Sequence, residues 1–329
     1  MAGIQTYSGL DPRTDLFAYE TFLERAQPYL CIEKFMDSKP VPKNGSKVIS
    51  LRRYESLPIG LKGLVEGVTP APSDLTFTDY SATLVQYGDH VVISDVVEMT
   101  HEDDVFGETV GLLGEQAAQM MEKMRWGIMT GGSNVIYAGT AGRSTVVGKV
   151  DDAYMTRVLR ALKRNNANYI TKALSASPAY KTSPIDRAYI AIGHVDLEND
   201  IRGLTNFVPR EQYTSMTPFD GEIGSWRNVR FILGTIYESI PDVGDTTVAG
   251  KITTSGARCD VYPLMVFGKG FFSGVALKGM NAVKVVGKKA EHSEADPFAQ
   301  RNFVSWKTMQ TALITNDLWG VRLEVACSS

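Results

Sequence analysis

The chain has 329 residues, of which 43% are hydrophobic and 22% charged, and a formal net charge of −3. This length allows one large or two modest hydrophobic cores, and the near-neutral charge argues against a sequence-specific DNA-binding protein, which normally carries a basic domain or stripe. No apolar run reaches the roughly 18 residues of a transmembrane helix, and the first residues lack the pattern of a secretory signal.

The N-terminal part of the chain predicts an arm followed by a turn-rich segment. The polar residues before Leu16 indicate a loose arm. Apolar residues then recur irregularly as far as Met36, and Pro28 is expected to break this segment. Residues 39–46, with two prolines and an Asn-Gly pair, predict turns rather than a regular element.

Two extended stretches come next. Residues 47–54 predict a strand with alternating apolar side chains. Residues 75–99 predict a second extended stretch, in which the alternation changes phase between Phe77 and Tyr80 and indicates a bulge. Residues 40–95 together predict a long two-stranded ribbon with few residues able to form its own core. Because an isolated ribbon is marginal in water, we expect it to lie on another surface, and a neighbouring subunit is one candidate.

The strongest helical pattern covers residues 102–130. Apolar residues recur at intervals of three and four from Phe106 to Ile128. Thr100 with Asp103 indicates a start that resembles a capping box. The sequence therefore predicts one long, continuous helix.

A stripe of glycines marks one side of this helix. Gly107, Gly111 and Gly114 repeat at helical intervals, and three glycines cost a helix about 2–3 kcal/mol relative to alanine. Such a stripe is tolerable where another backbone packs closely on the helix. A locally bent or weak helix is the alternative interpretation.

The remaining pattern mixes helices and strands. Residues 151–167 predict a second helix with apolar positions on one face. One short helix is expected at 195–202, and strands are expected at 188–193, 228–233, 261–267, 282–286, 304–314 and 321–326. The mixture indicates an α+β fold with a mixed sheet.

No catalytic or metal-binding motif emerges. The glycine-lysine pairs within 142–149 and 244–251 lack the spacing and the Ser or Thr of a phosphate loop. None of the four histidines pairs with another at metal-ligand spacing, and the three widely spaced cysteines indicate reduced, buried thiols rather than disulfides or a zinc site. We therefore expect no enzyme, no metal and no cofactor.

Polar residues of the predicted ribbon are candidates for contacts between subunits. Arg52 and Arg53 alternate across their strand, so that one faces its own subunit and the other faces solvent or a neighbour. Glu66 is a suitable partner for a guanidinium group across an interface.

A colinear series of short strings adds a resemblance. The series is Phe22–Pro28, Lys39–Gly45, Leu51–Tyr54, Glu66–Pro70, Gln86–Asp89, Leu113–Ala117, Gly221–Gly224 and Val266–Lys269. In order and spacing it resembles the major capsid proteins of tailed bacteriophages, in particular podophages related to coliphage N-four. The match extends from about residue 17 to about 140, and more thinly to about 270.

This resemblance implies the Hong Kong 97-type fold, an α+β architecture with an N-terminal arm, an extended β-ribbon loop, a long spine helix, and peripheral and axial domains. On this chain the arm is 1–37, the extended loop 38–99, the peripheral domain 100–150 with 281–329, its spine helix 102–130, and the axial domain 151–280. Some relatives crosslink their subunits through a lysine and an asparagine, but no motif here supports this and we expect no crosslink.

Candidate site residues follow from this plan. We expect subunit contacts of the extended loop at Asn44, Gly45, Arg52, Arg53, Lys62 and Glu66. We expect close packing on the spine helix at Gly107, Gly111 and Gly114.

The resemblance implies a major capsid protein that self-assembles into the icosahedral head shell around packaged double-stranded DNA. Its expected partners are copies of itself in pentamers and hexamers, the portal protein and, where needed, a scaffolding or decoration protein. DNA is expected in non-specific proximity only, and no membrane is involved. The expected location is the virion capsid, after assembly in the host bacterial cytoplasm. An encapsulin-type compartment shell is the alternative, and a cytosolic enzyme with an unrecognised site is a remote one.

Overall fold

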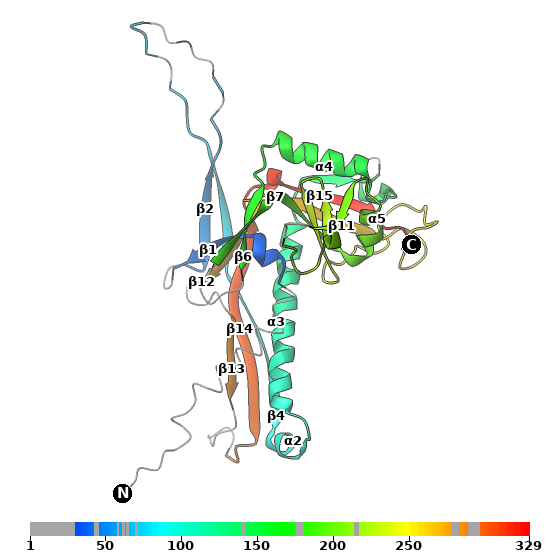
Figure 1. Ribbon diagram of the computed structural model, residues 1–329. Coiled ribbons are helices and arrows are strands. Elements are labelled where there is room, and N and C mark those ends of the chain that lie inside the picture. The colour runs from blue at the N-terminus through cyan, green and yellow to red at the C-terminus, as the bar shows by residue number, and fades with distance from the viewer. Residues whose placement is uncertain are drawn as a thin grey trace.

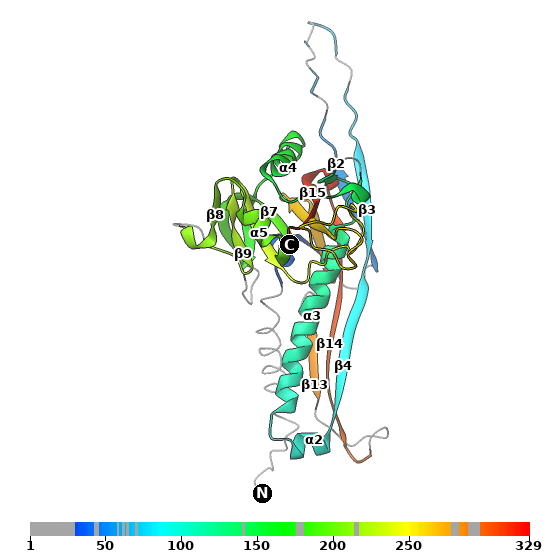
Figure 2. The same cartoon turned by 90° about the vertical axis from the view of Figure 1, so that its right-hand side faces the viewer.

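The computed structural model has an elongated shape with different parts of the chain at its two ends (Figure 1). It describes residues 30–42, 46–57, 59, 60, 63, 66–69, 72–139, 142–175, 181–213, 217–277, 283–288 and 297–329. A two-stranded ribbon projects at one end, a short helix lies at the other, and a mixed α/β body lies beside the long axis (Figures 1 and 2).

A five-stranded sheet runs along the long axis. Its strands are β1 (Asp37–Val41), β4 (Val85–Ser94), β12 (Phe272–Leu277), β13 (Lys284–Lys288) and β14 (Arg301–Ile314). Strand β14 pairs with β4, β12 and β13, and β1 pairs with β12. Alternate residues of β14 from Asn302 to Gln310 are buried, because a long helix covers one face of the sheet.

That helix, α3 (Val105–Met129), connects the two sheets of the protein. Its first half packs Val110 in one cluster with Trp306 of β14. Its last turns place Trp126 and Met129 in a separate cluster with residues of the second sheet. Figure 2 shows α3 lying along β14 and ending beside the body.

An eight-stranded mixed sheet forms the body. Its order is β5-β15-β11-β7-β10-β9-β8, with β6 beside β7. The strands are β5 (Val135–Tyr137), β6 (Ile170–Ser175), β7 (Lys181–His194), β8 (Phe207–Pro209), β9 (Glu222–Trp226), β10 (Val229–Gly234), β11 (Val261–Phe267) and β15 (Gly320–Ala326). Ile190 and Ile232 pack toward α3, whereas Tyr189 and Phe231 join the cluster on the other face. Both faces of this sheet are therefore buried.

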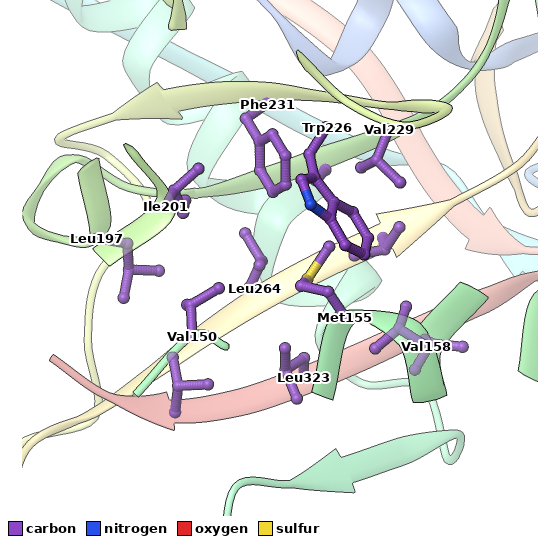
Figure 3. Close-up of a cluster of buried hydrophobic side chains, with 14 of the residues drawn as sticks. Val150, Met155, Val158, Leu197, Ile201, Trp226, Val229, Phe231, Leu264 and Leu323 are labelled. Atoms are coloured by element: carbon purple, nitrogen blue, oxygen red, sulfur yellow. The ribbon is translucent and has the colours of Figure 1, made fainter. Parts of the chain in front are cut away.

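Helix α4 (Asp152–Arg164) covers the face opposite α3. The side chain of Asp151 accepts the backbone N–H of Asp152 at 2.7 Å and caps the helix. Met155 and Val158 point from α4 into the same cluster as Trp226 (Figure 3). The other helical segments are α2 (Asp95–Thr100), α5 (Glu198–Arg202), η3 (Ile32–Phe35), η4 (Arg143–Thr145), η5 (Val195–Leu197), η6 (Arg210–Gln212) and η7 (Asp317–Trp319).

The predicted extent of the ribbon is wrong. Only β2 (Val48–Tyr54) and β3 (Phe77–Thr83) pair with each other, whereas β4 belongs to the five-stranded sheet. The expected bulge between Phe77 and Tyr80 is also wrong, because β2 and β3 pair without a register shift. The chain instead changes partners at Leu84, which is buried between β3 and β4. The altered alternation arises because Phe77 lies on the exposed face of the ribbon.

The predicted long helix is confirmed, but its predicted start is wrong. The side chain of Asp104 caps α3 by accepting the backbone N–H of Gly107 at 3.0 Å. Thr100 instead ends the separate helix α2, and its hydroxyl donates to the carbonyl of Val96 at 2.6 Å. Two capped helices therefore replace the single predicted start.

The sheet pairing bears on the expected domain boundaries. Strand β12 falls in the range predicted for the axial domain but pairs in the five-stranded sheet. Strand β15 falls in the range predicted for the peripheral domain but pairs in the eight-stranded sheet. The division of the chain into domains stays a prediction.

Helix α4 supplies a test of the body's core. Leu162 has no exposed surface, and we expect Leu162→Ala to lower the free energy of unfolding by about 2–5 kcal/mol, because the cavity cannot close completely. The neighbouring exposed Lys163 provides the control, and Lys163→Ala should change stability by no more than about 0.5 kcal/mol. Urea unfolding of the dissociated subunit measures both, and equal losses would contradict this packing.

Candidate functional site

The root of the ribbon rests on its own subunit. Ile49, Leu51 and Tyr80 pack in one cluster with Val275 and Leu313 of the five-stranded sheet. Strands β2 and β3 form a separate two-stranded sheet, so that within the described part of the chain the outer edge of each has no strand beside it. Unpaired strand edges are templates for pairing with another chain.

The two arginines of β2 serve opposite faces of the ribbon, as predicted. Arg52 donates hydrogen bonds to the two carboxylate oxygens of Asp79 at 2.7 and 2.8 Å, and its guanidinium lies 3.8 Å from the centre of the Phe77 ring. The hydrogen bonds from Arg52 hold the pKa of Asp79 below its ordinary range. Arg53 donates to the carbonyl of Thr315 at 3.3 Å. Both guanidinium groups therefore have partners within their own chain.

The far part of the ribbon exposes apolar side chains. Ile59 is 97% exposed, and Leu75 and Val68 are 65% and 63% exposed. Tyr54 and Phe77 lie edge to face with ring centres 6.3 Å apart and continue this surface toward the root. We call these five residues the ribbon surface. Apolar side chains exposed along one projecting segment are candidates for a contact with another molecule.

A second apolar surface lies at the opposite end of the molecule, around α2 (Figure 1). Met99 is 80% exposed and Phe298 is 78% exposed, while Val96 and Val92 are each more than half exposed. Phe298 shortly precedes β14, whose first residues pair with the last residues of β4. We call these four residues the base surface.

The structure describes only one of the other predicted contact residues, Glu66. Asn44, Gly45 and Lys62 lie outside the described residues. Glu66 is exposed on the ribbon, and the carboxylate that pairs with Arg52 is that of Asp79 instead. Sequence reasoning missed the ribbon surface, although apolar residues without periodicity in a segment rich in Gly and Pro are a usable signal.

The glycine stripe of α3 has more than one environment. A Cβ atom on Gly107 would collide with the carboxylate of Asp104, so that this glycine serves the helix cap. Gly111 and Gly114 are buried, and their predicted role in close packing stays a prediction. Strand β13 supplies a close approach of its own, because a Cβ on Gly287 would lie 2.9 Å from the ring of Phe106.

A buried carboxylate joins three distant segments of the chain. Oε1 of Glu122, on α3, accepts the backbone N–H groups of Cys31 and Ile32 at 3.2 and 2.8 Å and the hydroxyl of Tyr237 at 2.8 Å. Its other oxygen has no hydrogen-bond partner among the described residues. Burial raises the pKa of Glu122, against the opposing charge of Arg125. The sequence signal for this site is an acidic residue on the buried side of a long helix.

The described residues contain no group of three or more His, Cys, Asp or Glu side chains that could hold a metal ion. All three cysteines are free and buried, as predicted, and burial raises the pKa of Cys31 to about 11 and that of Cys327 to about 12. None of the helices in the described ranges is both long and apolar enough to cross a membrane.

Comparisons with known proteins identify relatives of this arrangement. A family model described as phage capsid protein matches residues 78–306. The capsid of Ralstonia phage GP4 superposes with a TM-score of 0.64 at 11% identity, over 91% of each chain. The capsid of cyanophage P-SCSP1u gives 0.62 at 13% identity, over 91% of this chain and 89% of the other.

An encapsulin matches less well. The holo-SrpI encapsulin complex from Synechococcus elongatus PCC 7942 gives a TM-score of 0.52 at 10% identity, over 88% of this chain and 84% of the other. No protein with a curated description matches the sequence. The likeness to solved capsids confirms the predicted α+β fold of the Hong Kong 97 type.

The raised pKa of Glu122 generates a pH-dependent prediction. Between the ordinary glutamate value of 4.5 and the raised value, the folded state binds more protons than the unfolded state. The contribution of Glu122 to stability is therefore fully present below pH 4.5 and is lost as the pH rises through this window. We expect Glu122→Gln, which keeps an acceptor oxygen, to remove this loss.

Urea unfolding across this pH range measures the free energy of unfolding of the variant and of the parent chain. The difference between the two pH profiles gives the effect of Glu122. Glu238 is exposed, so that Glu238→Gln is a matched control that should leave the pH profile almost unchanged. A Glu122→Gln profile parallel to that of the parent chain would contradict the assignment.

Proposed function

This chain belongs to the phage capsid protein family, and we propose that it is the major capsid protein whose copies build the icosahedral head shell around the double-stranded DNA of a tailed phage. The main support for a mechanism of assembly is that one elongated chain has two different apolar surfaces at its opposite ends (Figure 1).

The placement of these surfaces favours a repeating contact. A ribbon surface that contacts the base surface of another copy forms a heterologous interface, because the two patches differ. Heterologous interfaces with a suitable rotation close into rings, and until the ring closes the growing assembly has one free ribbon surface at one end and one free base surface at the other. Shells built in this way distribute the stabilising area over several neighbours instead of a single tight contact.

The finer assignments rest on the family and on the resemblance to podophages related to coliphage N-four. Pentamers and hexamers would gather around the axial domain, while the N-terminal arm and the extended loop reach neighbouring copies. Arg52, Arg53, Lys62 and Glu66 would then lie at or near contacts of the loop. The portal protein and, where needed, a scaffolding or decoration protein are further partners, and assembly takes place in the host bacterial cytoplasm.

An encapsulin-type shell is the second candidate, because the same fold includes the weaker encapsulin match. The two candidates differ in what the shell encloses, namely packaged DNA or cargo proteins. Nucleic acid protected from nuclease inside purified particles supports the first, and enclosed protein without nucleic acid supports the second.

The ribbon surface provides the direct test of assembly. We expect a chain with both Ile59→Asp and Leu75→Asp to fold normally, because both side chains are exposed, and to lose most of its capacity to form shells, because two carboxylates would enter an apolar contact. Electron microscopy and sedimentation measure the particles. The chain with Ile59→Leu and Leu75→Ile is the control and should assemble normally. Normal shells from the Asp variant would exclude this surface from assembly.

Amide hydrogen exchange gives a second prediction. In the dissociated subunit, residues 66–69 should exchange much faster than the middle of α3, because no described strand pairs with them. In assembled shells the same amides should become protected. Equal protection of residues 66–69 and α3 in the dissociated subunit would show that the ribbon needs no neighbour.

A further inference from the structure

A basic groove lies on the outer surface of the body, beside α4. The helix and the turn between β9 and β10 enclose a volume of about 430 Å³, lined by Arg160, Lys163, Arg164, Arg227 and Asn228 among others. All five are exposed. Figures 1 and 2 show α4 on the outside of the body, with the sheet on its inner side.

The amphipathic sequence of α4 creates this groove. Met155 and Val158 fill the core on one side (Figure 3), which leaves Arg157, Arg160 and Arg164 exposed on the helix. From residue 157 to residue 164 the helix rises about 10 Å. A DNA duplex presents about six phosphates over that length, at one per 1.7 Å.

Arg227 is held toward the groove before any ligand arrives. Its backbone has a φ of 52°, its guanidinium lies 4.3 Å from the centre of the Trp226 ring, and Nη1 donates to the hydroxyl of Thr156 at 3.3 Å. The indole of Trp226 is itself fixed by a hydrogen bond to the carbonyl of Thr205 at 2.8 Å. A positioned guanidinium loses less freedom when it binds.

The cations of the groove have no carboxylate partner within the described part of the chain. No ion pair is formed there by any of the five cations, which are Arg157, Arg160, Lys163, Arg164 and Arg227.

One carboxylate, that of Asp152, lies close enough to interact electrostatically with Arg227 of the groove. The charge of Arg227 contributes to lowering the pKa of Asp152, but the largest cause is the hydrogen bond from Thr205, whose hydroxyl lies 2.6 Å from that carboxylate. The groove therefore carries a net positive charge on a chain whose net charge is −3.

We propose that this groove binds the phosphate backbone of double-stranded DNA and that the face of α4 lines the interior of the shell. The proposal rests on the function proposed above. A contact with another protein fits less well, because no large hydrophobic side chain of α4 or of the β9–β10 turn is exposed, whereas protein interfaces have an apolar core. Arginine binds phosphate oxygens in a bidentate manner, which suits a groove with four arginines at its lining and rim.

The test removes three charges without disturbing the fold. The chain with Arg160→Gln, Lys163→Gln and Arg164→Gln keeps α4, since glutamine is a good helix former. A matched control removes three exposed cations elsewhere, with Lys172→Gln, Arg210→Gln and Lys269→Gln. Fluorescence anisotropy measures the binding of a short mixed-sequence DNA duplex to the full-length dissociated subunit over a range of salt concentrations.

We expect the groove variant to bind the duplex more weakly than the control variant. The slope of log affinity against log salt should fall by about 2.7, at about 0.9 for each cation removed. A chain with Asn228→Lys, which adds a cation to the groove lining and keeps the hydrogen bond from Arg227 to Thr156, should bind more tightly, with a slope steeper by about 0.9. Both variants should still form shells under the electron microscope.

Three results would overturn the inference. The first is an unchanged affinity and slope in both groove variants, which leaves the capsid function intact if shells form. The second is a groove variant that no longer assembles while the chain with Arg160→Lys and Arg164→Lys does, which assigns the groove to an acidic face of another subunit. The third is a parent subunit that binds no duplex at low salt. Failure of the parent chain to assemble would contradict the proposed function instead.

Discussion

The packing of α3 on two sheets joins the five-stranded sheet, which carries both ends of the molecule, to the body. The helix has 25 residues and a length of about 37 Å. Its first half is held by the five-stranded sheet and its last turns by the body. Because the root of the ribbon and α2 are both anchored to the five-stranded sheet, the root of the ribbon and the base surface keep a fixed separation. A shell needs this constancy, since every copy must offer its contacts at the same spacing.

The apolar residues at the two ends are not buried by the described part of their own chain. Beyond Tyr54 and Phe77 the ribbon has left the sheet on which its root is packed. Side chains such as Ile59 therefore stay in contact with water until another molecule covers them, and each one that becomes fully buried contributes about 1.5–3 kcal/mol. Such contributions are modest for one contact but add up when each copy touches several neighbours.

The sequence predicts those elements that depend on local periodicity. Helix α4, the long helix α3 and the long central strands follow from apolar residues at regular intervals. The extent of the ribbon does not, because β4 pairs with β14 across more than 200 residues of sequence, and no local pattern specifies that choice. The net charge of −3 likewise does not predict the basic face of α4, since a total charge does not describe how charges are distributed over a surface.

Glu122 illustrates a constraint that only the folded chain reveals. An apolar residue at this position of α3 would avoid the cost of burying a carboxylate, which is often the more stable choice for a buried polar group. It could not, however, accept the N–H groups of Cys31 and Ile32 or the hydroxyl of Tyr237, and buried donors without acceptors each cost about 1–3 kcal/mol. These three donors come from two segments that are distant from α3 in the sequence, namely the start of η3 and the residues that follow β10. The carboxyl group therefore helps to hold η3 and the segment around Tyr237 on the helix, together with the ion pairs of Arg125 with Glu33 and of Lys123 with Glu238, and this positional role accounts for an ionisable group in the interior of a shell protein.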